Sequence, residues 1–182
     1  MTTVTPLPLS RPFTRADLEA LPDDVHRYEL LDGTLLVSPG PSYAHQTVGG
    51  NLHLLLRAAC PSGLVVLLAP FAVGLAEDTE LQPDLLVAPR SQFTAKDLPG
   101  PPLLAVEVLS PSTRRVDLLL KRDRLQEAGC PSYWLVDPDE PSLLALQLDD
   151  GAYVEAARVS GDQAWTAEQP FSVTVVASEL VR

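Results

Sequence analysis

The sequence has few cysteines and no apolar run long enough to cross a membrane. Cys60 and Cys130, the two cysteines among 182 residues, lie far apart and form no CxxC or CxxH pair. We therefore expect two buried, unreactive thiols in a reducing compartment, and no zinc site. The longest apolar stretch, residues 64–70, is too short to span a bilayer, and residues 1–11 lack a signal-peptide pattern. These absences predict a soluble, cytoplasmic protein without a membrane partner.

The sequence is also poor in positive charge. Its net charge of −11 argues against strong non-specific binding of nucleic acid. The basic residues are nevertheless uneven, because one short stretch contains Arg114, Arg115, Lys121, Arg122 and Arg124. Two interpretations stay open for this stretch: a strip that faces phosphate groups, or a solvated helix face.

No internal repeat, low-complexity tract or linker divides the chain. A chain of this length buries roughly 70% of its unfolded surface and needs no disulfide to hold a core. We therefore expect a single domain over residues 1–182.

Local signals predict a mixed α/β order. Thr14 and Asp17 form a capping box for a short helix, and Asp32-Gly33 predicts a type I′ hairpin turn within residues 28–37. Ser42 is expected to cap a helix that ends near Ala59. The other expected elements are strands at 64–69, 71–75, 84–88 and 103–109, a helix at 112–129, and strands at 133–136, 143–148, 152–157 and 171–176.

Two carboxylates interrupt apolar strands in this pattern. Glu107 lies within the run 104–109, which has the composition of a strand buried on both faces, and Asp84 precedes another apolar strand. An ionised carboxylate in such a place is costly unless a cation, hydrogen bonds or a metal compensates it. Two of them on pairing strands would suit a hard divalent ion. The alternative, a satisfied core glutamate and a strand-end aspartate, remains open.

The order of these elements, with Pro-Asp before one strand and Glu near the end of the next, resembles the PD-(D/E)XK nuclease superfamily. More narrowly, the sequence resembles the bacterial Uma family of restriction endonuclease-like proteins. The resemblance implies a restriction-endonuclease-like α/β fold, a mixed sheet flanked by helices, with extra antiparallel strands at both ends. The matching segments are Tyr28–Gly33, Ser38-Pro39 with His45, Gln82–Asp84, Val106–Thr113, Asp117 with Lys121, Gly129–Pro131 and Tyr133–Pro138.

The resemblance also implies a site for Mg²⁺ or Mn²⁺. Asp84, Glu107 and the backbone carbonyl of Val108 would bind the metal, and Glu29 would be an outer ligand. The superfamily has a lysine two residues after the glutamate, where this sequence has Leu109. The catalytic lysine would therefore be Lys121, on the following helix. A second departure is Leu125, where many relatives have a tyrosine.

Other candidate residues have a plainer interpretation beside the functional one. Asp117 and Lys121 are spaced as an ordinary i, i+4 surface pair. His45 shares a helix face with Val48, which favours a core or supporting role over metal binding. Arg114 could contact phosphate, although no spacing requires it.

The function expected from these observations is metal-dependent endonucleolytic cleavage of nucleic acid, with DNA as the preferred substrate. Asp84, Glu107 and Lys121 would be its catalytic residues. The alternative is a non-catalytic module that binds nucleic acid or a protein through the same fold. A homodimer is also expected, because strands 143–148 and 171–176 have the composition of exposed edges that need cover.

Overall fold

The computed structural model describes residues 11–21 and 26–182. The expected single domain over 1–182 includes residues 1–10 and 22–25, which lie outside this part, so it stays a prediction. The helices are α1 (Arg15–Glu19), α2 (Tyr43–Ala59), the 3₁₀ helix η1 (Arg90–Gln92), the π-helix η2 (Val116–Lys121), α3 (Arg122–Glu127) and α4 (Ala177–Leu180).

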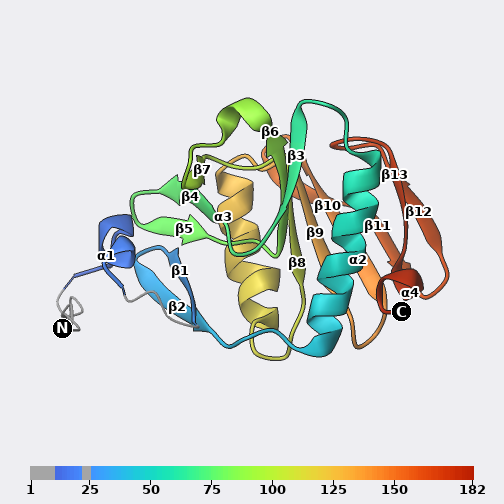
Figure 1. Cartoon of the computed structure of the whole chain (residues 1–182), viewed down its shortest axis with the longest axis horizontal. Coiled ribbons are helices and arrows are strands. Elements are labelled where there is room, and N and C mark those ends of the chain that lie inside the picture. The colour runs from blue at the N-terminus through green and yellow to red at the C-terminus, as the bar shows by residue number, and fades with distance from the viewer. Residues whose placement is uncertain (1–10, 22–25) are drawn as a thin grey trace.

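The strands form two mixed sheets and a separate hairpin (Figure 1). The central sheet has the order β11-β10-β9-β8-β6-β3, and the second sheet has the order β2-β1-β5-β4-β7. Parallel pairing joins β8 to β9 and β4 to β7. The strands are β1 (Arg27–Leu31), β2 (Thr34–Ser38), β3 (Leu64–Leu68), β4 (Ala72–Ala76), β5 (Thr79–Leu81), β6 (Leu85–Pro89), β7 (Asp97–Pro99), β8 (Leu104–Val108), β9 (Ser132–Asp137), β10 (Ser142–Asp149), β11 (Ala152–Ser160), β12 (Ala164–Ala167) and β13 (Val173–Val176).

Both faces of the central sheet are covered, and this explains the continuous apolar composition of β8. Leu104, Val106 and Val108 pack in one cluster with the buried face of α2. Ala105 packs on the other face, in a cluster that includes Leu125 of α3. Successive strand residues point to opposite faces, so Glu107 lies on the α3 face of a strand whose five residues are all buried.

The predicted capping and turn signals are confirmed. Thr14 and Asp17 form the capping box of α1, and the Ser42 hydroxyl accepts a hydrogen bond from the His45 amide at 3.2 Å. Asp32 and Gly33 both have positive φ, at 51° and 71°, as a type I′ turn requires. This turn sets the register of β1, which matters because β1 contributes residues to the candidate site.

The structure departs from the expected elements where strands are short and in one helix. The strands β5, β7 and β12 have three or four residues, too few for an alternating pattern to show in the sequence. The expected helix at 112–129 contains the π-helix η2 ahead of α3. Gly129 follows it with φ of 81°, as expected of a glycine that ends a helix.

The edge-strand argument for a homodimer is wrong. Residues 143–148 lie in β10, which pairs with both β9 and β11, so their apolar composition reflects burial inside the sheet. Residues 173–176 pair with β12, and Val173 and Val175 are buried in the cluster under α2. The edge strands of the central sheet are β3 and β11, and the charged, exposed face of β11 is typical of a protected edge.

The hairpin turn gives the first prediction. Gly33→Ala should destabilise the protein by about 1–2 kcal/mol, because an L-residue is strained at this φ and the added Cβ would overlap Pro12. Gly50→Ala is the control: it lies within α2 with open space around it, and should be neutral or stabilising by about 0.5–1 kcal/mol. Urea denaturation measures both. Equal effects of the two substitutions would contradict the prediction.

Candidate active site

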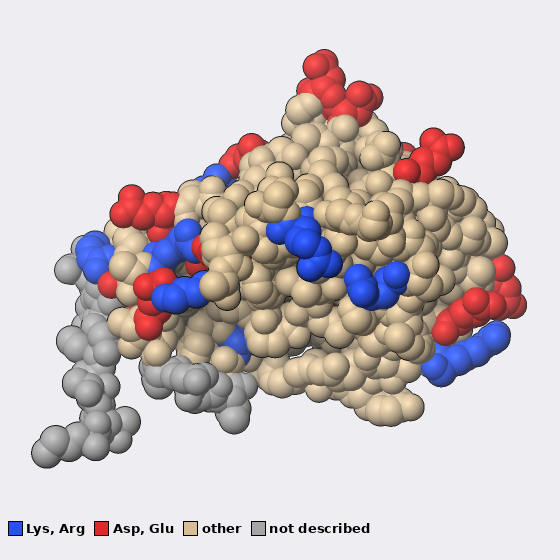
Figure 2. Space-filling model, turned by 45° about the horizontal axis from the view of Figure 1, so that its top comes forward, with Lys and Arg blue, Asp and Glu red and all other residues tan. Residues whose placement is uncertain are grey.

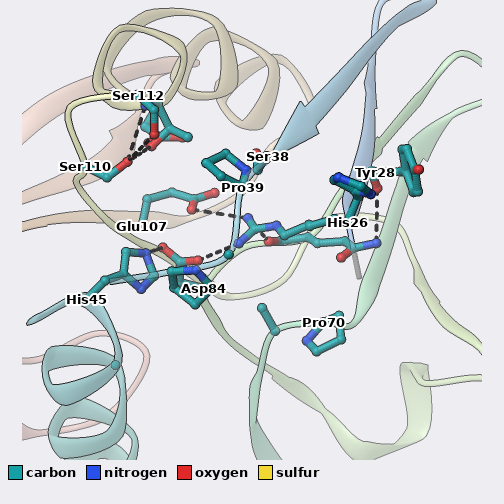
Figure 3. A pocket seen from close by; sticks show the side chains of 18 of the residues that line it. His26, Tyr28, Ser38, Pro39, His45, Pro70, Asp84, Glu107, Ser110 and Ser112 are labelled. Carbon is teal, nitrogen blue, oxygen red and sulfur yellow. Dashed lines mark hydrogen bonds and ion pairs between the residues drawn. The ribbon is translucent and has the colours of Figure 1, made fainter. Parts of the chain in front are cut away.

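Asp84 and Glu107 meet because their strands pair antiparallel. Leu85 of β6 lies opposite Val106 of β8, and continuing this register by one pair places Asp84 opposite Glu107. Residues opposite each other in a pair project to the same face, and Figure 3 shows the two carboxylates pointing toward one another. Their exposed fractions are 5% and 2%. The two carboxylates therefore project to the same face of the sheet, and their joint binding of one metal ion stays a prediction.

Asp84 is held by three donors. Its Oδ2 accepts a hydrogen bond from the Val108 amide at 2.8 Å and lies 3.0 Å from His45 Nε2. Its Oδ1 lies 2.7 Å from an Arg27 guanidinium nitrogen, Nη1. Burial alone would raise the pKa of Asp84, but the hydrogen bond from His45 and the charge of Arg27 hold that pKa well below its usual value. Asp84 is therefore ionised, and His45 supports it as the sequence favoured.

Lys121 points into the site. Its Nζ lies 2.9 Å from Glu29 Oε1, 3.0 Å from Glu107 Oε1 and 3.4 Å from Asp117 Oδ1. Lys121 as a whole residue is 2% exposed, so the surface-pair interpretation of Asp117 and Lys121 is wrong. Burial lowers the pKa of Lys121, but the surrounding carboxylates raise it above its ordinary value, so the amine stays charged.

The π-helix η2 supplies both Asp117 and Lys121 to the buried face. Leu119 and Leu120, between them, are about half exposed. The Tyr133 hydroxyl, on β9, donates a hydrogen bond to the backbone carbonyl of Asp117 at 2.9 Å. This contact attaches the widened turn to the sheet, and π-type turns within helices are frequent at functional sites.

We call Glu29, Asp84, Glu107 and Asp117 the acidic cluster. Burial raises the pKa of Glu107 well above its ordinary value; Lys121 opposes this effect, and the negative charge of Asp84 adds to it. Burial likewise raises the pKa of Asp117, again against Lys121. Lys121 stays charged because Glu29 lies beside it as well. Four carboxylates thus share few cations, and Glu107 and Asp117 are the two whose raised pKa favours retaining a proton.

Arg27 is the site residue that sequence reasoning missed. Its Nη2 donates to the Gln82 carbonyl and lies 3.5 Å from Glu29 Oε2 and 3.8 Å from Glu107 Oε2. A signal was present, because Arg27 is two residues before Glu29 on the same strand, and alternate strand residues share a face. Glu29 itself accepts a hydrogen bond from the Gln82 amide at 2.7 Å, which fixes its carboxylate beside Lys121.

Other predicted residues take different places. The Val108 amide binds Asp84, and because N–H and C=O of a strand residue point to the same edge, its carbonyl faces that side too. Leu109 stands where the superfamily has its lysine. Its side chain is buried in the core, so this position brings no positive charge to the site. Arg114 binds Asp137 at 2.6 Å and lines a separate cavity, which places it outside the candidate site.

Of the two interpretations of the basic stretch, the strip that faces phosphate groups gains no support from the structure. Lys121 is buried in the site, while Arg124 pairs with Asp32 and Glu127. On the face shown in Figure 2, basic side chains are isolated or mixed with acidic ones and make no continuous track. The surface therefore offers no broad electrostatic footprint for a polyanion on this face.

A cavity of about 710 Å³ opens onto the cluster. Its wall includes Asp84, Glu107, Lys121 and Arg27, and hydroxyl groups such as Ser42 and those of residues 110–113. Among the described residues no group of three or more His, Cys, Asp or Glu has the arrangement of a metal cage. Two converging carboxylates still suit Mg²⁺, which is commonly held by one or two carboxylates together with water and substrate phosphate.

The sequence profile described as "Uma2: Putative restriction endonuclease" matches residues 15–178. The chain belongs to the Uma2 family. A crystal structure of "a putative nuclease belonging to DUF820" from Anabaena variabilis has the same fold, with a TM-score of 0.76 at 16% identity, over 93% of this chain and 98% of that one. No curated protein matches the chain. None of the described helices has the length and apolarity needed to cross a membrane.

For this Uma2 member, the raised pKa of Glu107 predicts how stability varies with pH. A raised folded-state pKa gives stability that is present below the ordinary value of 4.5 and is lost as pH rises through the folded value. Glu107→Gln removes the titration, so its stability relative to the unchanged chain should increase as pH rises. Thermal melts from pH 5 to 8 without divalent ions measure it. A constant difference across this range would contradict the prediction.

Proposed function

We propose that this protein is a divalent-metal-dependent endonuclease that hydrolyses phosphodiester bonds in DNA. The observation that carries the proposal is the convergence of Asp84 and Glu107 on one buried space, with the charged amine of Lys121 beside Glu107. Membership of a family described as restriction endonucleases supports the reaction class. The alternative substrate, RNA, is tested by offering both nucleic acids.

The residues present fit a small hard cation. Asp84 and Glu107 would hold Mg²⁺ or Mn²⁺ through carboxylate oxygens, with the Val108 carbonyl as a third donor on the same side. When bound, such an ion lowers the pKa of a coordinated water and offsets charge on the phosphate. Glu29 would be an outer ligand of the metal, because its carboxylate is already bound to Lys121 and the Gln82 amide.

A catalytic lysine could either orient the attacking water or help to remove its proton, and Lys121 is suited to the first role. Because surrounding carboxylates raise its pKa, the amine keeps its proton and is a poor base. A fixed ammonium can instead orient the attacking water and stabilise negative charge that develops on the phosphate. We therefore assign Lys121 an electrostatic role and not proton removal.

One observation favours the non-catalytic alternative. Arg27 already lies within salt-bridge distance of both Asp84 and Glu107, so the two carboxylates are compensated by the chain itself. A module that had lost its chemistry could keep this ion pair and bind nucleic acid or protein without metal. Calorimetric titration with Mn²⁺ separates the two functions, because such a module has no reason to retain metal affinity.

The proposed roles of Lys121 and Glu107 predict different effects of substitution. Lys121→Met, which preserves length within the buried site, should reduce plasmid cleavage at least ~100-fold and leave Mn²⁺ affinity close to that of the unchanged chain. Glu107→Gln should lose both, because it removes a metal ligand. Plasmid nicking and calorimetry measure the two properties.

Lys96→Met is the control, since Lys96 is exposed and does not line the cavity. Circular dichroism establishes that each variant is folded. Cleavage by Lys121→Met at the unchanged rate would exclude the proposed role of Lys121. Absence of Mn²⁺ binding and of cleavage in the unchanged chain would favour the non-catalytic module.

A homodimer remains a prediction and now rests on the substrate alone. Cutting both strands of a duplex is simplest with two active sites related by a two-fold axis. Light scattering with the metal and a duplex of known mass should give the mass of that duplex plus twice the 19.6 kDa of the chain. A mass that corresponds to one chain per duplex would contradict the prediction of a homodimer. It would not affect the proposed cleavage of one DNA strand by one active site.

A further inference from the structure

The guanidinium of Arg27 lies between the two carboxylates that would hold a metal. Nη1 is 2.7 Å from Asp84 Oδ1, and Nη2 is 3.8 Å from Glu107 Oε2. The same Nη2 is 3.5 Å from Glu29 Oε2 and donates to the Gln82 carbonyl. One cation thus reaches three members of the acidic cluster.

The remaining oxygens of the two carboxylates are already occupied. Asp84 Oδ2 binds the Val108 amide and His45, and Glu107 Oε1 binds Lys121. The oxygens left to face a shared cation are therefore Asp84 Oδ1 and Glu107 Oε2, which are the two nearest Arg27. An ion at metal–oxygen distances of about 2.0–2.6 Å from both would overlap the guanidinium.

The contacts of Arg27 are those of a counter-ion and not of a fully satisfied structural arginine. Its Nε is buried and has no hydrogen-bond partner among residues 11–21 and 26–182. Its side chain is 23% exposed, far more than that of Asp84 or Glu107, and it lines the cavity. The guanidinium therefore has an open side through which it can leave while the carboxylates stay fixed by their other donors.

We propose that Arg27 is an internal counter-ion that occupies the divalent-cation position and exchanges with the incoming ion. This inference rests on the proposed function, because it requires a metal at Asp84 and Glu107. Arg27 stabilises the chain when no divalent ion is bound, and it competes with the ion for the same oxygens. Metal affinity is accordingly weaker than two buried carboxylates would otherwise give.

The test is calorimetric titration of Mn²⁺ and Mg²⁺, combined with thermal melts, on the unchanged chain and on Arg27→Gln. Removing the competing cation should raise Mn²⁺ affinity at least tenfold. It should also lower the melting temperature without metal, because buried carboxylates lose their partner, and enlarge the increase in melting temperature on adding metal. Arg27→Lys keeps a positive charge at this position and should restore weak metal binding.

Arg15→Gln is the matched control, because Arg15 is also partly buried and pairs with two carboxylates, Glu80 and Asp97. It should lower the melting temperature and leave Mn²⁺ affinity unchanged. If Arg27→Gln does not fold, the exchange is followed in the unchanged chain by the ¹⁵N–¹H resonance of Arg27 Nε, assigned with Arg27→Lys. This resonance should shift on Mg²⁺ titration as the guanidinium moves.

The outcomes separate this inference from the proposed function. Equal Mn²⁺ affinity of the unchanged chain and Arg27→Gln, or an Arg27 resonance unmoved by saturating Mg²⁺, would overturn the exchange and leave the metal site standing. Failure of both the unchanged chain and Arg27→Gln to bind either ion would remove the metal site, and with it the exchange. Tighter binding by Arg27→Gln alone supports the exchange.

Discussion

The burial of four carboxylates in one place is the constraint on which this structure depends. Glu29, Asp84, Glu107 and Asp117 are each at most 5% exposed, and an unpaired carboxylate at such depth is very costly. Lys121, Arg27, His45 and two backbone amides compensate them. Replacing such a group by apolar residues is often neutral or stabilising, so its presence at the centre of the fold points to a chemical purpose.

The compensation comes from separate parts of the chain. The central sheet contributes Glu107 on β8 and Asp84 just before β6, the second sheet contributes Arg27 and Glu29, and η2 contributes Lys121. The cluster therefore joins the two sheets and the helix between them through charge as well as packing. Inside a poorly polarisable core these interactions are strong and mutually dependent. The geometry of the site therefore depends on the docking of the second sheet, and that docking depends in turn on the site.

The part of the site that could be predicted from sequence is the part whose unfavourable burial can be recognised from neighbouring residues in the sequence. A carboxylate inside an apolar strand, as at Glu107, is visible without knowing its neighbours, and the resemblance supplied Lys121. Antiparallel pairing of β6 and β8 was not visible, nor was the π-helix, because both depend on tertiary contacts. Arg27 was missed because an arginine at the start of a strand is ordinary, and its spacing from Glu29 does not by itself predict its approach to Asp84.

The charge balance of the site bears on how a nucleic acid could approach it. The acidic cluster outnumbers its fixed cations, the whole chain is strongly acidic, and no basic track appears on the face in Figure 2. A phosphate entering the cavity therefore meets little attraction from the acidic cluster itself, and a bound divalent ion would supply positive charge there. Exchange of Arg27 for such an ion would replace one positive charge by two beside Asp84 and Glu107, and the guanidinium would remain as a further positive charge at the cavity wall. The same event that completes a metal centre would then also make the cavity more attractive to phosphate.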